Sequence, residues 1–179
     1  SYEFVDDTHV KIELRDDVSF SSGRKMDATA VKECLEDLIK VHDRAPSDLK
    51  IANITTDGDY TIIIETSEPT PAIINFLSDP YGCIIDMSVP EKDMIVAGTG
   101  PFIATSVSDT EIDLVKNTNY WGGDVKVDKV VVKGIVDGTT LTNALQNGEL
   151  DATYGLPYAS YSIFENNANY NIDYMETSR

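Results

Sequence analysis

The sequence predicts a mixed α/β fold, an α+β arrangement of mixed β-sheets with flanking helices. Three kinds of pattern predict it. Short β-branched runs alternate with polar residues, which is typical of half-buried strands. One stretch repeats its apolar residues at helical spacing behind Asp27, whose carboxylate can accept the free amide protons of a first turn. The pair Asp57-Gly58 suits the positive φ angles of a tight hairpin turn.

The first half of the chain predicts, in order, a strand, a capped helix, a hairpin and a short helix. The first strand spans 10–14 and the helix spans 28–42. The two hairpin strands start at 51 and 60, and the short helix spans 72–77. We expect the helix that starts at 28 to end before Pro46, because proline cannot continue a helix. No periodicity is visible from 78 to 98, where Pro80, Gly82 and Pro90 interrupt the pattern.

The second half predicts three further strands, one helix and a last short strand. The strands are 102–106, 111–116 and 129–136, and the last of these is apolar on both faces, which favours a central position in a sheet. Thr139 or Thr140 is expected to cap a helix, with Gly148 at the position where a helix commonly ends in glycine. We expect a short strand over 150–154.

Composition limits the partners of this chain. It has 179 residues, is 41% hydrophobic and carries a net charge of −17. One domain or two small ones are therefore expected, and nucleic acid and anionic membranes are unfavourable partners. No apolar run approaches the roughly 20 residues that span a bilayer. The chain opens inside a strand-like pattern with no signal peptide, which favours a mature or excised segment.

The two cysteines form no CxxC pair and are too few for a disulfide framework. Cys34 lies on the apolar side of the predicted helix, so we expect it in the core. Cys83 follows Gly82 in a predicted loop. A disulfide between the two cysteines is neither selected nor excluded by their spacing.

No catalytic constellation is recognisable. His9 and His42 are expected to be structural, and the sequence contains no HExxH, Walker or G-x-S-x-G motif. Gly98-Thr99-Gly100 begins like a dinucleotide loop, but Ile103 replaces its third glycine and Pro101 removes an amide donor. We therefore expect no catalytic residue, no metal site and no cofactor. A carboxylate-dependent hydrolase is the less favoured alternative.

Seven phrases of the sequence, taken in order, resemble one family. They are Leu14-Arg-Asp-Asp-Val-Ser-Phe-Ser-Ser-Gly23, Asp27-Ala-Thr-Ala-Val31, Asp59-Tyr-Thr-Ile-Ile-Ile64, Gly98-Thr-Gly-Pro-Phe102, Asn119-Tyr-Trp-Gly-Gly123, Asp128-Lys-Val-Val131 and Asn147-Gly-Glu-Leu-Asp151. Together they resemble the extracellular solute-binding proteins of ABC importers, in the peptide- and nickel-binding family (family 5). The resemblance covers nearly the whole chain.

The resemblance implies part of a periplasmic-binding-protein-like type II lobe. By analogy, residues 1–97 are the accessory subdomain of the first lobe, and residues 98–179 are part of that lobe's main sheet. The N-terminal segment and the second lobe of full family members are missing, so the chain resembles a fragment. Gly98, Gly100 and Pro101 are then the interdomain crossing, where glycine allows backbone angles that other residues resist.

The function implied is that of a substrate-binding component of an ABC transporter. It captures an oligopeptide or related small solute outside the membrane and delivers it to a permease by closure of two lobes. A nickel or metal-chelate ligand is the alternative within the family. The resemblance further implies a monomer that is extracellular or periplasmic, anchored as a lipoprotein in the full-length protein.

Three residues are candidates for ligand binding: Lys116, Tyr120 and Trp121. The resemblance places Lys116 where the nickel-binding branch has an arginine, so the charge is kept without the bidentate fork. A surface charge on an edge strand is the competing interpretation of Lys116. For Trp121 we expect packing over a sheet edge, with a mostly buried ring and a bonded indole N–H; stacking on a ligand is the alternative.

Overall fold

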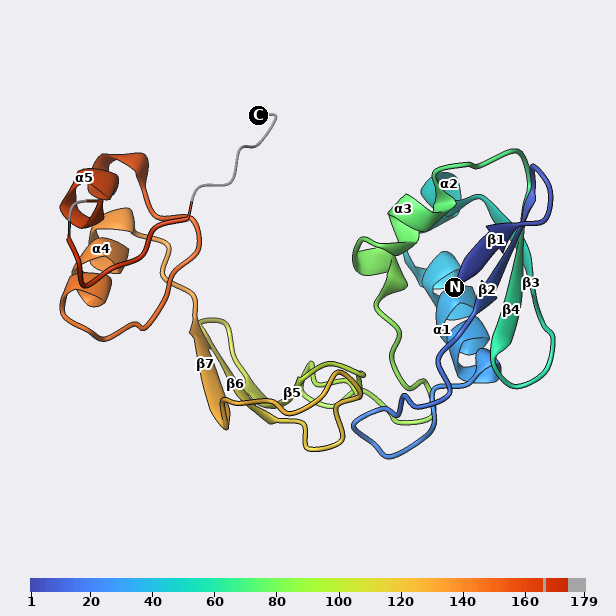
Figure 1. The fold of residues 1–179 in the computed structure, drawn as a ribbon, viewed down its shortest axis with the longest axis horizontal. Coiled ribbons are helices and arrows are strands. Elements are labelled where there is room, and N and C mark those ends of the chain that lie inside the picture. Colours follow the sequence, from blue (N-terminus) through green and yellow to red (C-terminus); the bar gives the residue numbers. More distant parts are fainter. Residues whose placement is uncertain (166, 174–179) are drawn as a thin grey trace. The chain divides into compact units, whose positions relative to one another are not determined.

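The structure is a computed structural model that describes residues 1–165 and 167–173. The chain divides into two compact units, Ser1–Val132 and Lys133–Arg179. Its element order and mixed α/β composition agree with the fold class expected from the sequence (Figure 1).

A four-stranded antiparallel sheet forms the first part of unit 1. Its spatial order is β1-β2-β4-β3. The strands are β1 (Tyr2–Phe4), β2 (His9–Glu13), β3 (Ile51–Thr56) and β4 (Thr61–Thr66). The predicted hairpin joins β3 to β4, and Gly58 has the positive φ of 71° that favours glycine in the turn.

The core of this sheet lies under helix α1 (Ala28–Val41). Asp27 caps α1 by accepting the Ala30 N–H at 2.8 Å, as predicted. Alternate residues of β4 are buried, so one face of the sheet meets the apolar stripe of the helix. The buried cluster consists of Val10, Ala28, Val31, Leu35, Ala45, Leu49, Ile54, Ile62, Ile64 and Ile73.

Three short helices complete this packing: α2 (Ala45–Leu49), α3 (Ile73–Leu77) and the 3-10 helix η1 (Pro80–Gly82). Helix α2 was not anticipated, because Pro46 was interpreted only as a stop signal. Proline at the first turn also suits the start of a helix. The side chain of His42 adds a cap to α2, since its Nδ1 accepts the N–H groups of Arg44 and Ala45 at 3.2 and 3.1 Å.

A second sheet follows, with strands β5 (Phe102–Val107), β6 (Glu111–Lys116) and β7 (Lys129–Lys133) in that spatial order. Strands β5 and β6 are antiparallel. The prediction of a central strand at 129–136 was wrong, because β7 lies at one edge of this sheet. Val131 and Val132 are exposed there. A run that is apolar on both faces shows what a strand can bury, but it does not reveal which strands stand beside it.

Unit 2 contains α4 (Gly138–Gln146), the 3-10 helix η2 (Tyr158–Ser160) and α5 (Tyr161–Phe164). Asp137, and not a threonine, caps α4, because its carboxylate accepts the Thr140 N–H at 2.8 Å. Gly148 ends the helix with a φ of 72°, as predicted. The predicted strand over 150–154 was wrong: that segment has no partner strand within the described part of the unit.

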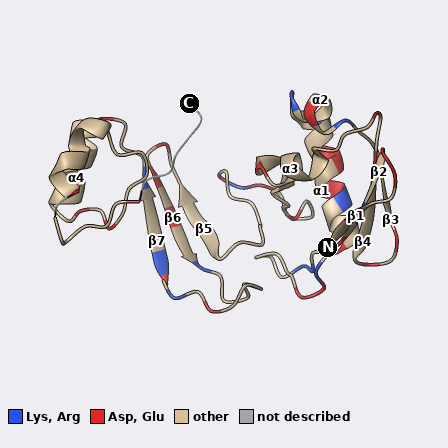
Figure 2. Cartoon of the chain, turned by 45° about the horizontal axis from the view of Figure 1, so that its top comes forward, with Lys and Arg blue, Asp and Glu red and all other residues tan. Residues whose placement is uncertain are grey.

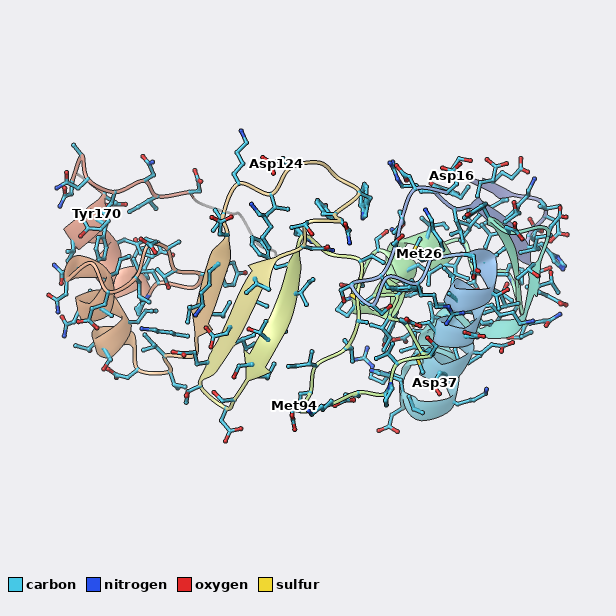
Figure 3. All side chains as sticks on the ribbon, turned by 90° about the horizontal axis from the view of Figure 1, so that it is seen from below. Asp16, Met26, Asp37, Met94, Asp124 and Tyr170 are labelled. Atoms are coloured by element: carbon cyan, nitrogen blue, oxygen red, sulfur yellow. The ribbon has the colours of Figure 1, made fainter. Side chains whose placement is uncertain are left out.

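Asp and Glu residues outnumber Lys and Arg in the chain, and Figure 2 marks where both kinds lie along the ribbon. Among the described residues, no helix is both long and apolar enough to span a membrane. Met94, labelled in Figure 3, is exposed in the turn between Lys92 and Ile95.

The central strand β4 offers a direct test of the first core. Ile64→Ala should lower the free energy of unfolding by about 3 kcal/mol, because Ile64 is fully buried and the truncation leaves a cavity. Its neighbour Ile63 faces the other side of the sheet and is only half-buried. Ile63→Ala is the matched control and should cost less than about 1.5 kcal/mol in the same urea titration. Equal losses would contradict the assignment of the buried face.

Candidate functional site

The aromatic turn, defined here as Asn117–Gly123, contains two of the three ligand-binding candidates. Asn117 organises it and is buried. Its side-chain amide donates to the carbonyl of Gly100 at 2.9 Å, and its Oδ1 accepts the N–H of Asn119 at 3.0 Å. Its backbone N–H donates to the carbonyl of Pro101 at 2.8 Å. Sequence reasoning missed this role, although an asparagine that bonds two residues ahead is a common turn device.

The two glycines of the aromatic turn suit their positions for different reasons. Gly123 has a φ of 104°, which is the left-handed region that favours glycine. A Cβ on Gly122 would lie 2.5 Å from the ring of Tyr120. Gly122 thus leaves room for the ring of Tyr120, whereas the backbone conformation of Gly123 favours glycine. Both allow the chain to turn after Trp121.

Trp121 is not mostly buried, contrary to the expectation: 41% of the residue is exposed. Its indole N–H makes no hydrogen bond within the described residues. The ring packs beside Tyr120, with centroids 5.3 Å apart, and the guanidinium of Arg15 lies 4.7 Å from the ring centroid. A cation above an aromatic ring is attracted electrostatically to the negative face of the ring. Trp121 thus joins the aromatic turn to the segment after β2.

Arg15 is fixed over the ring by a carboxylate. Its Nε and Nη2 donate to the two oxygens of Asp17 at 2.9 and 2.6 Å. The ion pair with Asp17 raises the pKa of Arg15. This fork leaves the guanidinium plane available for stacking on Trp121.

Lys116 lies at the end of β6, the middle strand of its sheet, and not on an edge strand as the competing interpretation held. Its Nζ is 2.7 Å from Asp128, and this contact raises the pKa of Lys116. The backbones of the same two residues are also joined, because the Lys116 N–H donates to the Asp128 carbonyl at 2.9 Å. The lysine charge is therefore already paired within this chain.

The crossing residues are held by carbonyl groups. The carbonyl of Gly98 accepts the N–H of Ser21 at 2.8 Å, and those of Gly100 and Pro101 accept from Asn117. Neither glycine has a positive φ, and a Cβ at either position would meet nothing within 4 Å. The expectation that special backbone angles require these glycines was wrong. Hydrogen bonds to Ser21 and Asn117 hold residues 98–101 in place.

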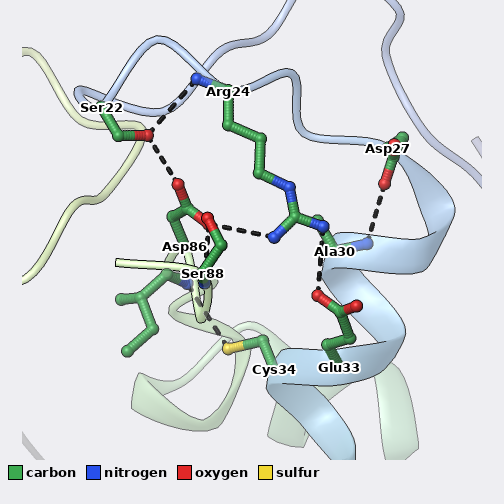
Figure 4. Close-up of polar contacts among 9 residues, drawn as sticks. Ser22, Arg24, Asp27, Ala30, Glu33, Cys34, Asp86 and Ser88 are labelled. Atoms are coloured by element: carbon green, nitrogen blue, oxygen red, sulfur yellow. Dashed lines mark hydrogen bonds and ion pairs between the residues drawn. The ribbon is translucent and has the colours of Figure 1, made fainter. Parts of the chain in front are cut away.

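A buried carboxylate anchors the segment that precedes the crossing (Figure 4). Asp86 has a fully buried side chain. It accepts hydrogen bonds from the hydroxyls of Ser22 and Ser88 at 2.6 and 2.7 Å, and from Nη1 of Arg24 at 3.0 Å. The same guanidinium reaches Glu33 on α1 at 3.1 Å. These contacts join three segments: the loop after β2, helix α1 and the segment before Gly98.

The electrostatics of Asp86 favour its charged form. Burial by itself would raise the pKa of this carboxyl, but the hydrogen bonds from Ser22, Ser88 and Arg24 outweigh burial and hold the pKa far below its usual range. Asp86 in turn raises the pKa of Arg24. Because this carboxylate is already saturated with donors, it is suited to structure and not to proton transfer.

The arrangement as a whole offers contacts for binding. The described residues contain no group of three or more His, Cys, Asp or Glu side chains arranged to hold a metal ion. What the aromatic turn presents is one half-exposed indole, supported by Tyr120 and Arg15, beside a paired lysine. Such a surface can stack on a planar or apolar group of a solute.

Trp121→Ala should lower the free energy of unfolding by about 1–2 kcal/mol, less than the about 3–5 kcal/mol of a buried aromatic, because nearly half of the residue is already solvated. Phe20→Ala is the control, since Phe20 is 1% exposed and should show the full loss. Urea unfolding followed by circular dichroism measures both. A loss at Trp121 as large as that at Phe20 would contradict the exposed placement.

Arg15→Ala should increase quenching of tryptophan fluorescence by acrylamide, because the guanidinium covers one face of the ring. Trp121 is the only tryptophan, so the signal reports this site alone. Arg44→Ala, at an exposed arginine on another segment, is the matched control. Unchanged quenching in Arg15→Ala would show that the stack is not maintained in solution.

Asp86→Asn should lower the free energy of unfolding at pH 7 by about 2–4 kcal/mol, because Arg24 loses its buried partner but stays about a quarter exposed. The folded pKa of Asp86 is depressed, so its contribution is present above the unfolded pKa of about 3.9 and is lost as pH falls further. The difference between wild type and variant should therefore shrink below about pH 4.

Denaturant titrations at pH 7, 5, 4 and 3 measure this difference. Asp109→Asn, at an exposed turn residue between β5 and β6, is the control and should change little at any of these pH values. A pH-independent loss in Asp86→Asn would show that the carboxylate charge is not what stabilises the network.

Comparisons with known proteins identify the family of this chain. Residues 1–179 match the description "Bacterial extracellular solute-binding proteins, family 5 Middle". The chain is 30% identical over 171 residues to the nickel-binding protein NikA of Staphylococcus aureus, covering 94% of this chain and 35% of that protein. It is 29% identical over 184 residues to the glutathione-binding protein GsiB of Escherichia coli K12, with the same coverage of 94% and 35%.

Solved structures give the same result. The crystal structure of S. aureus NikA in complex with Ni(L-His)2 has a TM-score of 0.89 at 29% identity, over 94% of this chain and 37% of that one. The nickel ABC transporter structure from Bacillus halodurans has a TM-score of 0.87 at 35% identity, over 94% and 35%. The chain thus spans about a third of the length of these relatives. It belongs to the family 5 extracellular solute-binding proteins of bacteria and corresponds to their middle part.

Proposed function

We propose that the protein carrying this chain is the substrate-binding component of an ABC importer. It captures a small solute outside the membrane and presents it to a permease. The observation that carries the proposal is the match of all 179 residues to the family, together with the TM-score of 0.89 to NikA. A non-catalytic role is in keeping with relatives whose names describe binding.

The ligand class that we favour is a peptide or a related small solute. One similar protein is named for binding glutathione, which is itself a short peptide. The half-exposed ring of Trp121 supplies an apolar contact of the kind that lines small-molecule sites. We propose that Tyr120 holds the ring of Trp121 in place beside the solute. Lys116 is proposed to hold the adjacent end of its strand.

A nickel chelate is the second candidate, and the NikA relatives favour it. A chelate brings its own metal ligands, so this candidate requires no metal-ligand cluster in the chain itself. An unpaired cation would favour a chelate that carries a net negative charge. Lys116 is paired with Asp128, which is why we place the peptide first.

The domain assignment remains a proposal. Residues 1–97 would be the accessory subdomain of the first lobe and residues 98–179 part of its main sheet, with Gly98, Gly100 and Pro101 as the crossing. The hydrogen bonds at Gly98 and Asn117 support a junction there. We further propose that the mature protein works as a monomer, outside the cell membrane or in the periplasm, and is held there as a lipoprotein.

Capture in this proposal depends on closure of two lobes around the solute. A solute on one lobe keeps much of its surface wet, whereas small-molecule sites typically bury about 70–90% of it. Without the second lobe, the free energy of binding should be less favourable by several kcal/mol. Each 1.4 kcal/mol lost raises Kd about tenfold. The chain alone is thus expected to fold but to bind solutes only weakly.

Calorimetry on the 179-residue chain checks this expectation. Oligopeptides, glutathione and the nickel–histidine complex should each bind with millimolar Kd or not at all. Trp121→Ala, measured alongside, should abolish any residual change in heat if the indole contacts the solute. A stoichiometric complex of micromolar or tighter Kd would show that this part of the protein suffices as a site.

The proposed transport function is tested separately on the complete gene product. Its tryptophan fluorescence and melting temperature should respond to one of the three solutes, with no turnover of generic ester substrates. Hydrolysis of an ester, abolished by a carboxylate substitution, would instead support the hydrolase alternative.

A further inference from the structure

The two cysteines meet across segments that are far apart in sequence. Cys34 lies within α1, and Cys83 directly follows η1, 49 positions later. The thiol of Cys34 donates to the carbonyl of Cys83 at 3.9 Å, and its Sγ accepts the N–H of Ile85 at 3.4 Å. Figure 4 shows this sulfur reaching from α1 toward the segment that carries Asp86. Cys34 is therefore seated against the backbone on both sides of residue 84.

The sulfur of Cys34 lies close to the backbone of Cys83, 3.9 Å from its carbonyl oxygen. Bond lengths of about 1.2 Å for C=O and 1.5 Å for Cα–C put the Cα of Cys83 within about 6.5 Å of the Cys34 sulfur. A disulfide has an S–S length of about 2 Å, and its Cα atoms are separated by about 4.4–6.8 Å. In a disulfide each sulfur lies about 4 Å from the Cα of the partner cysteine. Joining the sulfurs therefore requires the Cys83 side chain to rotate toward Cys34 and the Cys83 backbone to approach it by up to about 2.5 Å.

The surroundings keep Cys83 in place over Cys34. Just before it, the backbone of Gly82 is so close to Leu77 that a Cβ would lie 1.8 Å from the Leu77 carbonyl oxygen. Just after it, Asp86 is held by its network of hydrogen bonds. Both ends of the short segment 82–86 are thus anchored, while Cys83 itself is exposed and lies outside the strands.

The two thiols differ in accessibility. Burial raises the pKa of the Cys34 thiol, which keeps it protonated and slow to react. The exposed Cys83 is accessible to a small oxidant, and Cys34 is then the nearest group able to resolve the product. Family members are described as extracellular, where disulfides form and persist.

We propose that Cys34 and Cys83 form an intramolecular disulfide outside the cell that fastens the segment before the crossing to helix α1. The co-reactant is a low-molecular-weight disulfide, RSSR. The Cys83 thiolate attacks one sulfur, forms a mixed disulfide and releases one RS⁻. Cys34 then loses its proton to water and attacks the Cys83 sulfur, which releases the second thiolate. The protein loses two hydrogens, and RSSR is reduced to two RSH.

The bridge would close a loop of 49 residues around the first core. Cross-linking a loop of this size restricts the unfolded chain more than the folded one and so raises stability. The part of the protein that benefits is the contact of α1 with the segment leading to Gly98. The disulfide would therefore make this side of the crossing more rigid.

The experiment treats the 179-residue chain with oxidised glutathione, followed by unfolding, alkylation with iodoacetamide and peptide mass spectrometry. We expect a cross-linked peptide pair containing Cys34 and Cys83, with neither thiol alkylated. The oxidised chain should melt at least ~5 °C above the reduced chain. Cys83→Ser, at the exposed position, is the matched control and should show neither cross-link nor shift.

Two results would overturn the proposal. One is a stable glutathione adduct on Cys83 while Cys34 remains open to alkylation. The other is a melting shift on oxidation that is as large in Cys83→Ser as in the wild type. Because neither readout uses a solute, the outcome is independent of whether the transport function is correct.

Discussion

The buried carboxylate of Asp86 is the constraint on which the arrangement of unit 1 depends. A charge removed from water is costly unless donors replace its hydration. Here Ser22, Ser88 and Arg24 supply them from two separate loops, and Arg24 extends the connection to Glu33 on α1. Any displacement of one segment leaves a buried charge partly unsatisfied. Asp86 therefore fixes the path of the chain between the first core and the second sheet.

Different contacts hold the two ends of residues 98–101, the proposed crossing. On the side of the first core, the bonds are made by Asp86 and by Ser21, whose N–H donates to Gly98. On the side of the second sheet, Asn117 binds the carbonyls of Gly100 and Pro101. The Arg15–Trp121 stack adds a third connection. Polar backbone groups of a connecting loop are satisfied in this way without a strand or helix.

This construction is suited to a binding protein. The sheets position the elements, whereas the contacts around residues 98–101 are polar and join residues that are distant in the sequence. Trp121 is held on one ring face by Arg15 and is solvated elsewhere, so it combines a fixed position with an accessible surface. In the proposed function, that accessible surface meets the solute while the pair of Lys116 and Asp128 keeps the end of β6 in place.

Local patterns in the sequence determined the elements of this protein, and tertiary contacts decided their environment. Helix α1 with its Asp27 cap, the Asp57-Gly58 hairpin and the strand at 111–116 were predictable, because capping, turn geometry and alternation act over a few residues. The family was also recognisable from seven ordered phrases. The exposure of Trp121, the edge position of β7 and the roles of Asp86 and Asn117 were not predictable. Each depends on which distant residues share its surroundings, and only the folded chain brings Arg15 to Trp121 and Arg24 to Asp86.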